Sequence, residues 1–307
     1  MTTNLGEAAA LLTAICYSIS SIFFTRAGQK FGPLTSNRLR LVLALLLLGL
    51  IHWIAFGSPV PLNAGLQRWL WLGTSGIVGL AIGDLFLFQA YLIIGPRLGL
   101  LFLSLSPALA TVLAWLFLGE RLSLGKILGI VVTLVGIAWV VLESNTNHKS
   151  SASDEAPKEP KYAVKGVVAG LIAATGQALG VVLAKPGLAD GFSPISGNVI
   201  RMSAAFLAIW LLTLVQGQVV STIHQANQQR SGLWYILGGA IFGPLIGVSL
   251  ALFAVQNTNV GIASTLIALP PIFLLPVGHF ILKEHISWQA VLGTVIAVAG
   301  VGLLFWL

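Results

Sequence analysis

Long apolar runs follow one another along almost the whole chain, separated by short polar connections. Each run has the roughly 20 residues that an α-helix needs to cross about 30 Å of hydrocarbon. The pattern therefore predicts an all-α integral membrane protein with ten transmembrane helices. The expected spans are 5–24, 38–57, 69–94, 97–118, 123–142, 163–184, 195–216, 232–255, 260–282 and 287–306.

One internal segment breaks this pattern. Residues 143–162 read ESNTNHKSSASDEAPKEPKY, a polar stretch that contains proline and carries charges of both signs. A segment of this composition cannot bury enough apolar surface to fold, so it predicts a flexible linker. The linker divides the chain into residues 1–142 and 163–307, with five expected helices in each part.

The two parts repeat each other. An offset of 164 residues, without gaps, superposes glycines, a proline and a glutamate at the same spacing, and an offset of 161 residues superposes an Asn and an Arg near the start of a helix. Self-similarity over half a chain indicates a duplicated structural unit. The pairs are Gly79 and Gly243, Gly83 and Gly247, Ala90 and Ala254, Pro107 and Pro271, Glu120 and Glu284, Gly129 and Gly293, Gly136 and Gly300, Asn37 and Asn198, and Arg40 and Arg201.

An odd number of helices per repeat has a topological consequence. Two consecutive copies of a five-helix unit must enter the membrane in opposite orientations. The sequence thus predicts an inverted-topology pair related by a pseudo-two-fold axis in the membrane plane. Secondary transporters commonly use this design, because exchanging the conformations of the two repeats moves the opening from one side of the membrane to the other.

Composition agrees with a membrane location. Charged residues make up 8% of the chain and hydrophobic residues 57%, whereas soluble domains carry about 25% charged residues. The net charge of +7 comes from scattered side chains near the ends of apolar runs, where Lys and Arg reach the interface. Nucleic acid is not an expected partner, because binding it needs a dense basic face.

The repeated segments resemble a known family. Residues 79–136 read GLAIGDLFLFQAYLIIGPRLGLLFLSLSPALATVLAWLFLGERLSLGKILGIVVTLVG, and residues 243–300 carry the same spacing around LPPIFLLPVGHFILKEHISWQAVLG. This pattern is similar to the EamA-type repeat of the drug/metabolite transporter superfamily, over essentially the whole chain. The resemblance implies a ten-helix carrier with a central cavity and both termini in the cytoplasm. It implies no single substrate, since the superfamily handles amino acids, sugars, nucleotide-linked sugars, nucleobases and drugs.

The distribution of positive charge favours the other orientation. Counted together with the Lys and Arg in the adjoining helix ends, the odd-numbered connections between the expected helices hold 11 Lys and Arg, and the even-numbered ones hold 5. Cytoplasmic loops usually carry the excess. The count therefore conflicts with cytoplasmic termini, and the orientation stays open between the two indications.

Ionisable side chains inside expected helices are candidates for function, because a charge at bilayer depth is costly unless it faces a cavity or a partner. Asp84 lies in an apolar helix, and its counterpart in the second repeat is Val248. It either titrates a proton or binds a cation, or it pairs with an Arg such as Arg40. The symmetric Arg40 and Arg201 either bind a substrate carboxylate or phosphate, or they anchor helices and form salt bridges.

Uncharged side chains extend the candidate site. Gln89 and Gln177 are expected to line a cavity, and Tyr17 and Tyr91 are candidates for stacking on a planar substrate. Two further polar pairs are expected to cap helices instead, Asn37 with Asn198 and Glu120 with Glu284.

Two prolines at equivalent positions of the repeats are candidates for kinks. Pro107 and Pro271 lie within expected helices, where proline removes a hydrogen-bond donor. Such kinks either bend during alternating access or stay static.

These patterns predict a secondary transporter for a small metabolite, an amino-acid-like or related polar or amphipathic compound, acting in export by alternating access. The alternatives are a channel-like facilitator or uniporter, and a carrier for sugars, nucleotide-related compounds or drugs. Because nucleophile, metal-ligand and ATP-binding motifs do not occur, neither an enzyme nor a cofactor nor a metal site is expected. The expected partners are the substrate and the lipid bilayer, with protons as a candidate coupling ion. The expected state is a multi-pass monomer or homodimer in a bacterial plasma membrane.

Overall fold

The computed structural model describes residues 4–87, 89–90, 93, 102–143, 160–270, 272–274 and 288–306. These residues form helices and connections, without a β-strand in the described part. Two candidate residues, Tyr91 and Pro271, lie outside it, as do residues 144–159 of the predicted linker and Glu284.

In the described part of the first repeat, the chain forms several helical stretches. They are α1 (Leu5–Phe31), α2 (Pro33–Phe56), α3 (Leu66–Gly76) continued by the π-helix η2 (Ile77–Gly83), α5 (Ser106–Leu118) and α6 (Leu124–Glu143), with a short 3-10 turn η1 (Leu62–Ala64) before α3.

The second repeat has the same order. Its helices are α7 (Pro160–Gly187), α8 (Pro194–Val215), α10 (Arg230–Ala240) continued by the π-helix η3 (Ile241–Gly247) and α11 (Val248–Asn257), α12 (Val260–Ile267) and α14 (Trp288–Trp306). One element was not expected: α9 (Val219–Gln228) is a short amphipathic helix in the connection between the spans predicted at 195–216 and 232–255.

Helix length and apolarity agree with a multi-pass membrane protein. Within the described residues, six helical stretches are long and apolar enough to cross a bilayer. Four shorter apolar helices, Ser106–Leu118, Leu124–Trp139, Val260–Leu274 and Val291–Leu304, occupy the places of the remaining predicted spans. The ten-helix count stays a prediction, because these four are shorter than a full crossing.

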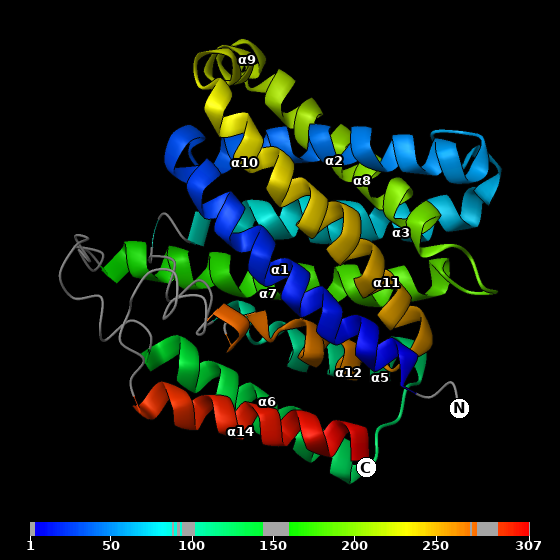
Figure 1. Ribbon diagram of the computed structural model, residues 1–307, viewed down its shortest axis with the longest axis vertical. Helices are drawn as coiled ribbons and strands as arrows, with labels where there is room; N and C mark the ends of the chain where they lie inside the picture. Colours follow the sequence, from blue (N-terminus) through cyan, green and yellow to red (C-terminus); the bar gives the residue numbers. More distant parts are fainter. Residues whose placement is uncertain are drawn as a thin grey trace.

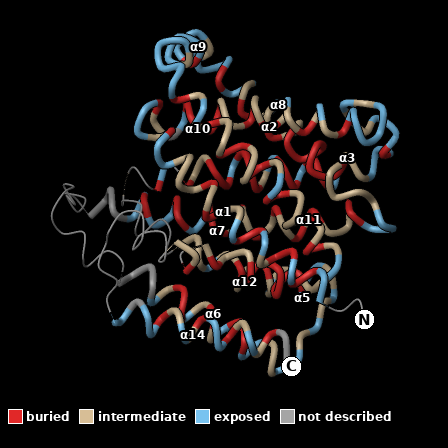
Figure 2. Tube along the Cα trace, in the orientation of Figure 1, coloured by how far each residue is buried: buried red, intermediate tan, exposed pale blue. Residues whose placement is uncertain are grey.

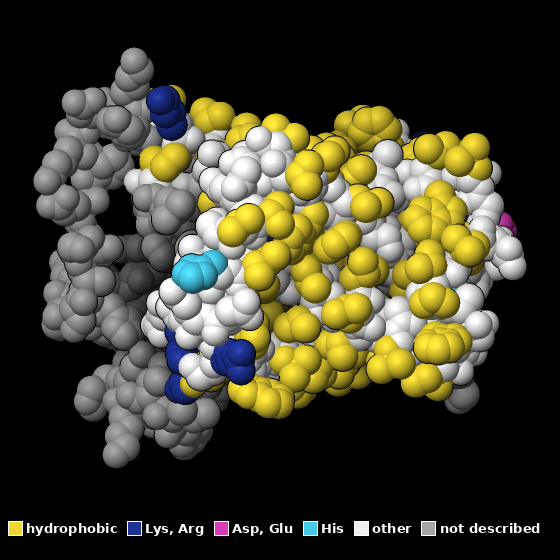
Figure 3. Space-filling model, turned by 90° about the horizontal axis from the view of Figure 1, so that it is seen from above, with side chains coloured by type: hydrophobic (Ala, Val, Ile, Leu, Met, Phe, Trp, Pro, Cys, Tyr) yellow, Lys and Arg dark blue, Asp and Glu magenta, His cyan; other side chains and the backbone are white. Residues whose placement is uncertain are grey.

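Apolar side chains cover the outside as well as the inside. Leu46, Ile54, Leu207 and Leu211 are more than half exposed, whereas buried positions are dominated by Ala, Leu and Ile (Figure 2). Seen from above, the surface is largely hydrophobic between its ends, and the coloured charged side chains lie near those ends (Figure 3). An exterior of this kind is solvated by lipid rather than by water.

Equivalent elements of the two repeats pack against each other. Helices α6 and α14 cross so closely that a Cβ on Gly136 would lie 2.7 Å from the Cβ of Ala297, and Gly300 faces Thr133. These are the same contact seen twice, since the 164-residue offset converts 136 to 300 and 133 to 297. Such reciprocity is what a two-fold relation between the repeats requires.

The first helix of each repeat packs on the π-helix of the other repeat. Gly79 of η2 lies against Gly180 of α7, and Gly243 of η3 lies against Ser20 of α1. The ends of the chain agree with opposite orientations, because α1 begins and α14 ends on one side of the molecule. On the opposite side α6 ends and α7 begins (Figure 1).

Of the two prolines that were expected to kink helices, Pro107 lies in the described part of the chain and marks a break between helical pieces. Pro107 is in the first turn of α5, directly after a turn at Ser104 and Leu105. The equivalent positions Ala268 and Leu269 interrupt the second repeat after α12. Pro107 therefore begins a helix instead of bending one from within, because the first helical turn needs no N–H donor. Whether either break moves stays a prediction.

Candidate functional site

The two π-helices occupy identical places in the repeats. Residues 77–83 of η2 and 241–247 of η3 are related by the 164-residue offset, and Asp84 and Val248 follow them. The wider π turn is rare and occurs most often at functional positions. Two pairs of repeated glycines lie inside these segments, Gly79 with Gly243 and Gly83 with Gly247.

Asp84 lies between the two repeats, and each of its two carboxylate oxygens has a partner. It forms an ion pair with Arg40 of α2, whose side chain is 18% exposed while that of Asp84 is 10% exposed. Its second oxygen, Oδ1, accepts a hydrogen bond of 2.7 Å from Nε2 of Gln177 on α7. Gln177 also donates to the carbonyl of Gly79 at 3.2 Å. The geometry corresponds to the second interpretation of Asp84, a carboxylate neutralised by Arg40.

Arg201, the counterpart of Arg40, is placed differently. It is 5% exposed on α8, and its Nη2 lies 3.6 Å from the position that a Cβ on Gly79 would take. Among the described residues it forms no ion pair, and its Nε has no hydrogen-bond partner. The repeat therefore presents one arginine paired with an acid and one without.

Tyr17 completes the cluster. Its ring packs on Gly247 of η3, and it is close enough to Arg40, Asp84 and Arg201 to interact electrostatically with all three. Tyr17 and Gln177 occupy equivalent places, since each is the residue of the first helix of its repeat that covers the last glycine of the opposite π-helix. We call Tyr17, Arg40, Asp84, Gln177 and Arg201 the central cluster.

The other candidates lie elsewhere. Gln89 is exposed, and in the part of the chain that the structure describes no hydrogen bond joins it to the central cluster. Asn37 and Asn198 were expected to cap helices, which is wrong: α2 begins after Gly32 and α8 after Ser193. Both residues lie within their helices rather than at the ends, and both side chains are buried. The amide nitrogen of Asn198 donates to the carbonyl of Pro244 in the middle of η3 at 2.7 Å and to the hydroxyl of Ser249 at 2.9 Å.

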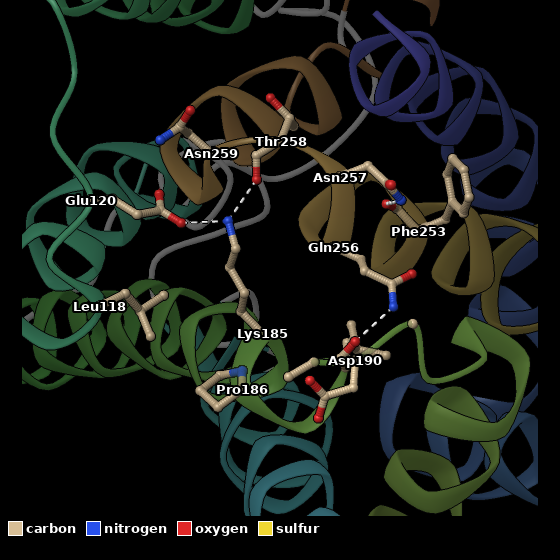
Figure 4. A pocket seen from close by; sticks show the side chains of 13 residues that line it. Leu118, Glu120, Lys185, Pro186, Asp190, Phe253, Gln256, Asn257, Thr258 and Asn259 are labelled. Carbon is tan, nitrogen blue, oxygen red and sulfur yellow. Dashed lines mark hydrogen bonds and ion pairs between the residues drawn. The ribbon is translucent and has the colours of Figure 1, made fainter. Parts of the chain in front are cut away.

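A second polar region lines a pocket of about 970 Å³ on the side of the molecule where the chain begins and ends. The ends of α5, α7 and α11 and the start of α12 surround it (Figure 4). Lys185 extends from α7 to the carboxylate of Glu120 and to the carbonyl of Thr258, at 2.7 Å from the latter. One lysine thus joins the first repeat to the turn between α11 and α12.

Glu120 was expected to cap the helix that follows it, and this is half right. Its Oε2 accepts a hydrogen bond of 2.9 Å from the backbone N–H of Val260. Val260 is the first residue of α12 in the opposite repeat. Glu120 is therefore a helix cap, but for a helix brought beside it by the pairing of α5 with α12 and not for α6.

Replacing Lys185 with methionine should keep the aliphatic stem and remove the ammonium group. We expect the unfolding midpoint to fall, by the equivalent of about 1–2 kcal/mol, because Glu120 and the Thr258 carbonyl lose a charged donor. Thermal unfolding in detergent measures this change. Lys30→Met is the matched control, since Lys30 is exposed, donates to the hydroxyl of Ser231 and lies 5.7 Å from the ring centroid of Tyr235, without a carboxylate partner among the described residues. Equal midpoints for the two variants would contradict the assignment.

The sequence did not indicate that three charged side chains form hydrogen bonds between helices. Lys185 and Glu7 lie near helix ends, where sequence reasoning favours exposure, yet Glu7 accepts a 2.7 Å hydrogen bond from Thr258. Arg38 was expected to reach the interface, but it is 8% exposed. It donates to Thr222 at 3.1 Å and to Gln218 at 2.5 Å. Its partners come from the region of α9, the helix that was not expected.

Comparison with known proteins supports the repeat architecture. A solved crystal structure superposes with a TM-score of 0.71 at 17% identity, over 98% of this chain and 95% of the other, which shows a shared fold. The uncharacterised transporter YxxF of Bacillus subtilis (strain 168) is 29% identical over 133 residues. That match covers 43% of this chain and 41% of YxxF, so it spans about two fifths of the length of this relative.

The family assignment rests on both repeats. The pattern of the EamA-like transporter family matches residues 4–142 and again residues 164–306. The two matches begin and end beside the repeat boundaries predicted at 142 and 163. With its apolar helices and duplicated packing, this multi-pass membrane chain belongs to the EamA-like transporter family.

Proposed function

We propose that this protein is a secondary transporter that moves a small metabolite across a membrane by alternating access. The central cluster carries the proposal. The first repeat contributes Tyr17, Arg40 and Asp84, and the second contributes Gln177 and Arg201. Charged groups held between two repeats at membrane depth are typical of the sites where carriers bind substrates and coupling ions.

The packing between the repeats supports movement of one repeat against the other. Between α7 and η2 the contacts are made mainly by glycine backbone atoms, which can slide with little side-chain rearrangement, whereas the rings of Tyr17 and Phe24 on α1 pack on the glycines of η3. The Lys185–Glu120 ion pair links the repeats on the side of the molecule where the chain begins and ends. An inverted ten-helix architecture would form and break such a link in alternation.

The substrate that fits this cluster is amino-acid-like, or a related polar or amphipathic compound. Guanidinium groups recognise carboxylates, and the ring of Tyr17 offers an apolar surface beside them. We propose export from a bacterial cell through the plasma membrane, by a monomer or a homodimer. Carriers of sugars, nucleotide-related compounds or drugs in the same family are the alternatives.

Counterflow in liposomes tests the proposal. Cells with and without the protein are first compared by metabolite profiling, and a compound whose level differs is loaded into liposomes that contain the purified protein. We expect saturable uptake of the labelled compound that accelerates when unlabelled compound is present on the opposite side. A carrier shows this trans-stimulation because the loaded site returns faster than the empty one.

A channel-like facilitator gives a different result. Its flux is not accelerated by compound on the opposite side, and it does not saturate in the same concentration range. Absence of both properties in liposomes that retain folded protein would overturn the alternating-access mechanism. Liposomes of the same lipid without the protein provide the control for passive leak.

A further inference from the structure

The two repeats are equivalent in packing but unequal in charge. After each π-helix comes one residue that the offset makes equivalent, Asp84 in the first repeat and Val248 in the second. Two arginines, Arg40 and Arg201, are likewise equivalent. The acid in the first repeat is the ion-pair partner of Arg40, and the valine in the second can be no such partner for Arg201.

Arg201 is therefore a cation without a matching anion. It is 5% exposed, its Nε has no hydrogen-bond partner, and among the described residues it forms no ion pair. The carboxylate of Asp84 acts on Arg201 from a distance, but its two oxygens are engaged by Arg40 and Gln177. The central cluster thus has two positive charges and one negative charge in the membrane interior.

A buried guanidinium destabilises a protein unless an anion compensates its charge. We infer that Arg201 is the receptor for an anionic group of the transported compound, most simply a carboxylate, which takes the place that Asp84 takes for Arg40. The inference rests on the proposed function in one respect, namely that the bound anion is the cargo. It adds a charge requirement and names the residue that imposes it.

The surroundings of Arg201 fit a carboxylate. Nη2 of Arg201 faces Gly79, where a Cβ would lie 3.6 Å from Nη2 and 3.3 Å from the Cα of Gly180, so Gly79 places no side chain against the guanidinium. The half-buried Tyr17 lies near the guanidinium and has a hydroxyl that can donate to a second oxygen. The side chains of Arg40 and Asp84 in the same cluster are 18% and 10% exposed. A planar guanidinium binds a carboxylate with two parallel hydrogen bonds, which an amide cannot accept in the same way.

Thermal unfolding of the full-length protein in detergent tests the inference, with its nine tryptophans as the fluorescence signal. The probes are matched pairs of acids and their primary amides: benzoate and benzamide, 4-methylpentanoate and 4-methylpentanamide, and L-leucine and L-leucinamide. We expect at least one acid to raise the midpoint, by about 3 °C at roughly ten times its dissociation constant, while its amide does not.

Two variants separate binding from structure. Arg201→Gln removes the uncompensated charge, so its midpoint without ligand should equal or exceed that of the wild type, and the acids should no longer shift it. Arg38→Gln is the matched control, because Arg38 is also buried but is hydrogen-bonded to Thr222 and Gln218. This control should have a lower midpoint and keep the response to acids.

Three results would overturn the inference: no acid shifts the wild type, amides act as well as acids, or Arg201→Gln keeps the full response. The transporter proposal fails separately. Binding of an acid through Arg201 without flux in liposomes contradicts the carrier, whereas flux restricted to cations or neutral compounds contradicts only the anion receptor.

Discussion

Replacing Asp84 with asparagine should lower the stability of the protein by about 3–5 kcal/mol, because the variant leaves Arg40 as an uncompensated charge in a buried site. Asparagine keeps the shape of the side chain and its bond from Gln177, so the loss isolates the ion pair. The unfolding midpoint in detergent and the yield of folded protein measure the effect. With Arg201 already unpaired, the variant would hold two buried cations and no acid in the central cluster.

The exposed pair of Arg68 and Asp190 provides the matched control. Its charged atoms are 3.8 Å apart and the Asp190 side chain is 88% exposed, so Asp190→Asn should change stability by less than about 1 kcal/mol. The double variant Asp84→Asn, Arg40→Gln should recover part of the loss, since it removes both charges. A midpoint for Asp84→Asn equal to that of the wild type would contradict a buried ion pair at this place.

Transport by the same variant decides whether Asp84 also couples protons. If a proton on Asp84 breaks the pair with Arg40 during the cycle, flux through the asparagine variant should no longer depend on pH while binding persists. If the pair is only structural, residual flux should keep the pH dependence of the wild type. Stability and pH-dependent flux both equal to the wild type would contradict both roles.

Adding a single methyl group at the contact between the repeats should also lower the stability of the protein. Gly180→Ala would place a Cβ 2.8 Å from the Cα of Gly79 and 3.2 Å from the carbonyl oxygen of Ser75. These neighbours are backbone atoms, which cannot rotate away, so α7 must move off η2. We expect a loss of about 1–3 kcal/mol together with most of the flux, because the shift also separates Gln177 from Asp84.

Alanine variants of two other glycines provide controls for Gly180→Ala. A Cβ on Gly28 in α1 would have nothing within 4 Å of it, and Gly28→Ala should be neutral or stabilise the helix by up to about 1 kcal/mol. Gly243→Ala meets the Ser20 side chain, which can adopt another rotamer, so its loss should be smaller than that of Gly180→Ala. The order of the three unfolding midpoints checks this interpretation. Equal midpoints for Gly180→Ala and Gly28→Ala would show that η2 and α7 can separate freely.

Much of the architecture could be predicted from the sequence because the lipid bilayer restricts which structures a chain can form. A membrane helix must satisfy its own backbone and expose apolar side chains, so run lengths alone indicate where helices lie. The 164-residue offset likewise placed equivalent residues at equivalent structural positions, as the two π-helices and the reciprocal contacts of Gly136 and Gly300 demonstrate. The asymmetry between Asp84 and Val248 was also visible in the sequence.

The tertiary structure alone decided how those residues are used. Tyr17 and Gln177 join the same cluster because α1 and α7 each cross to the opposite repeat, and Glu120 caps α12 for the same reason. Neither the pairing of Arg40 nor the lack of an ion-pair partner for Arg201 among the described residues follows from their equivalent positions in the repeats. Sequence periodicity determines which residues form a helix, but ion pairs and hydrogen bonds join residues 44 to 93 positions apart in this cluster, and only packing between the repeats determines which charges meet.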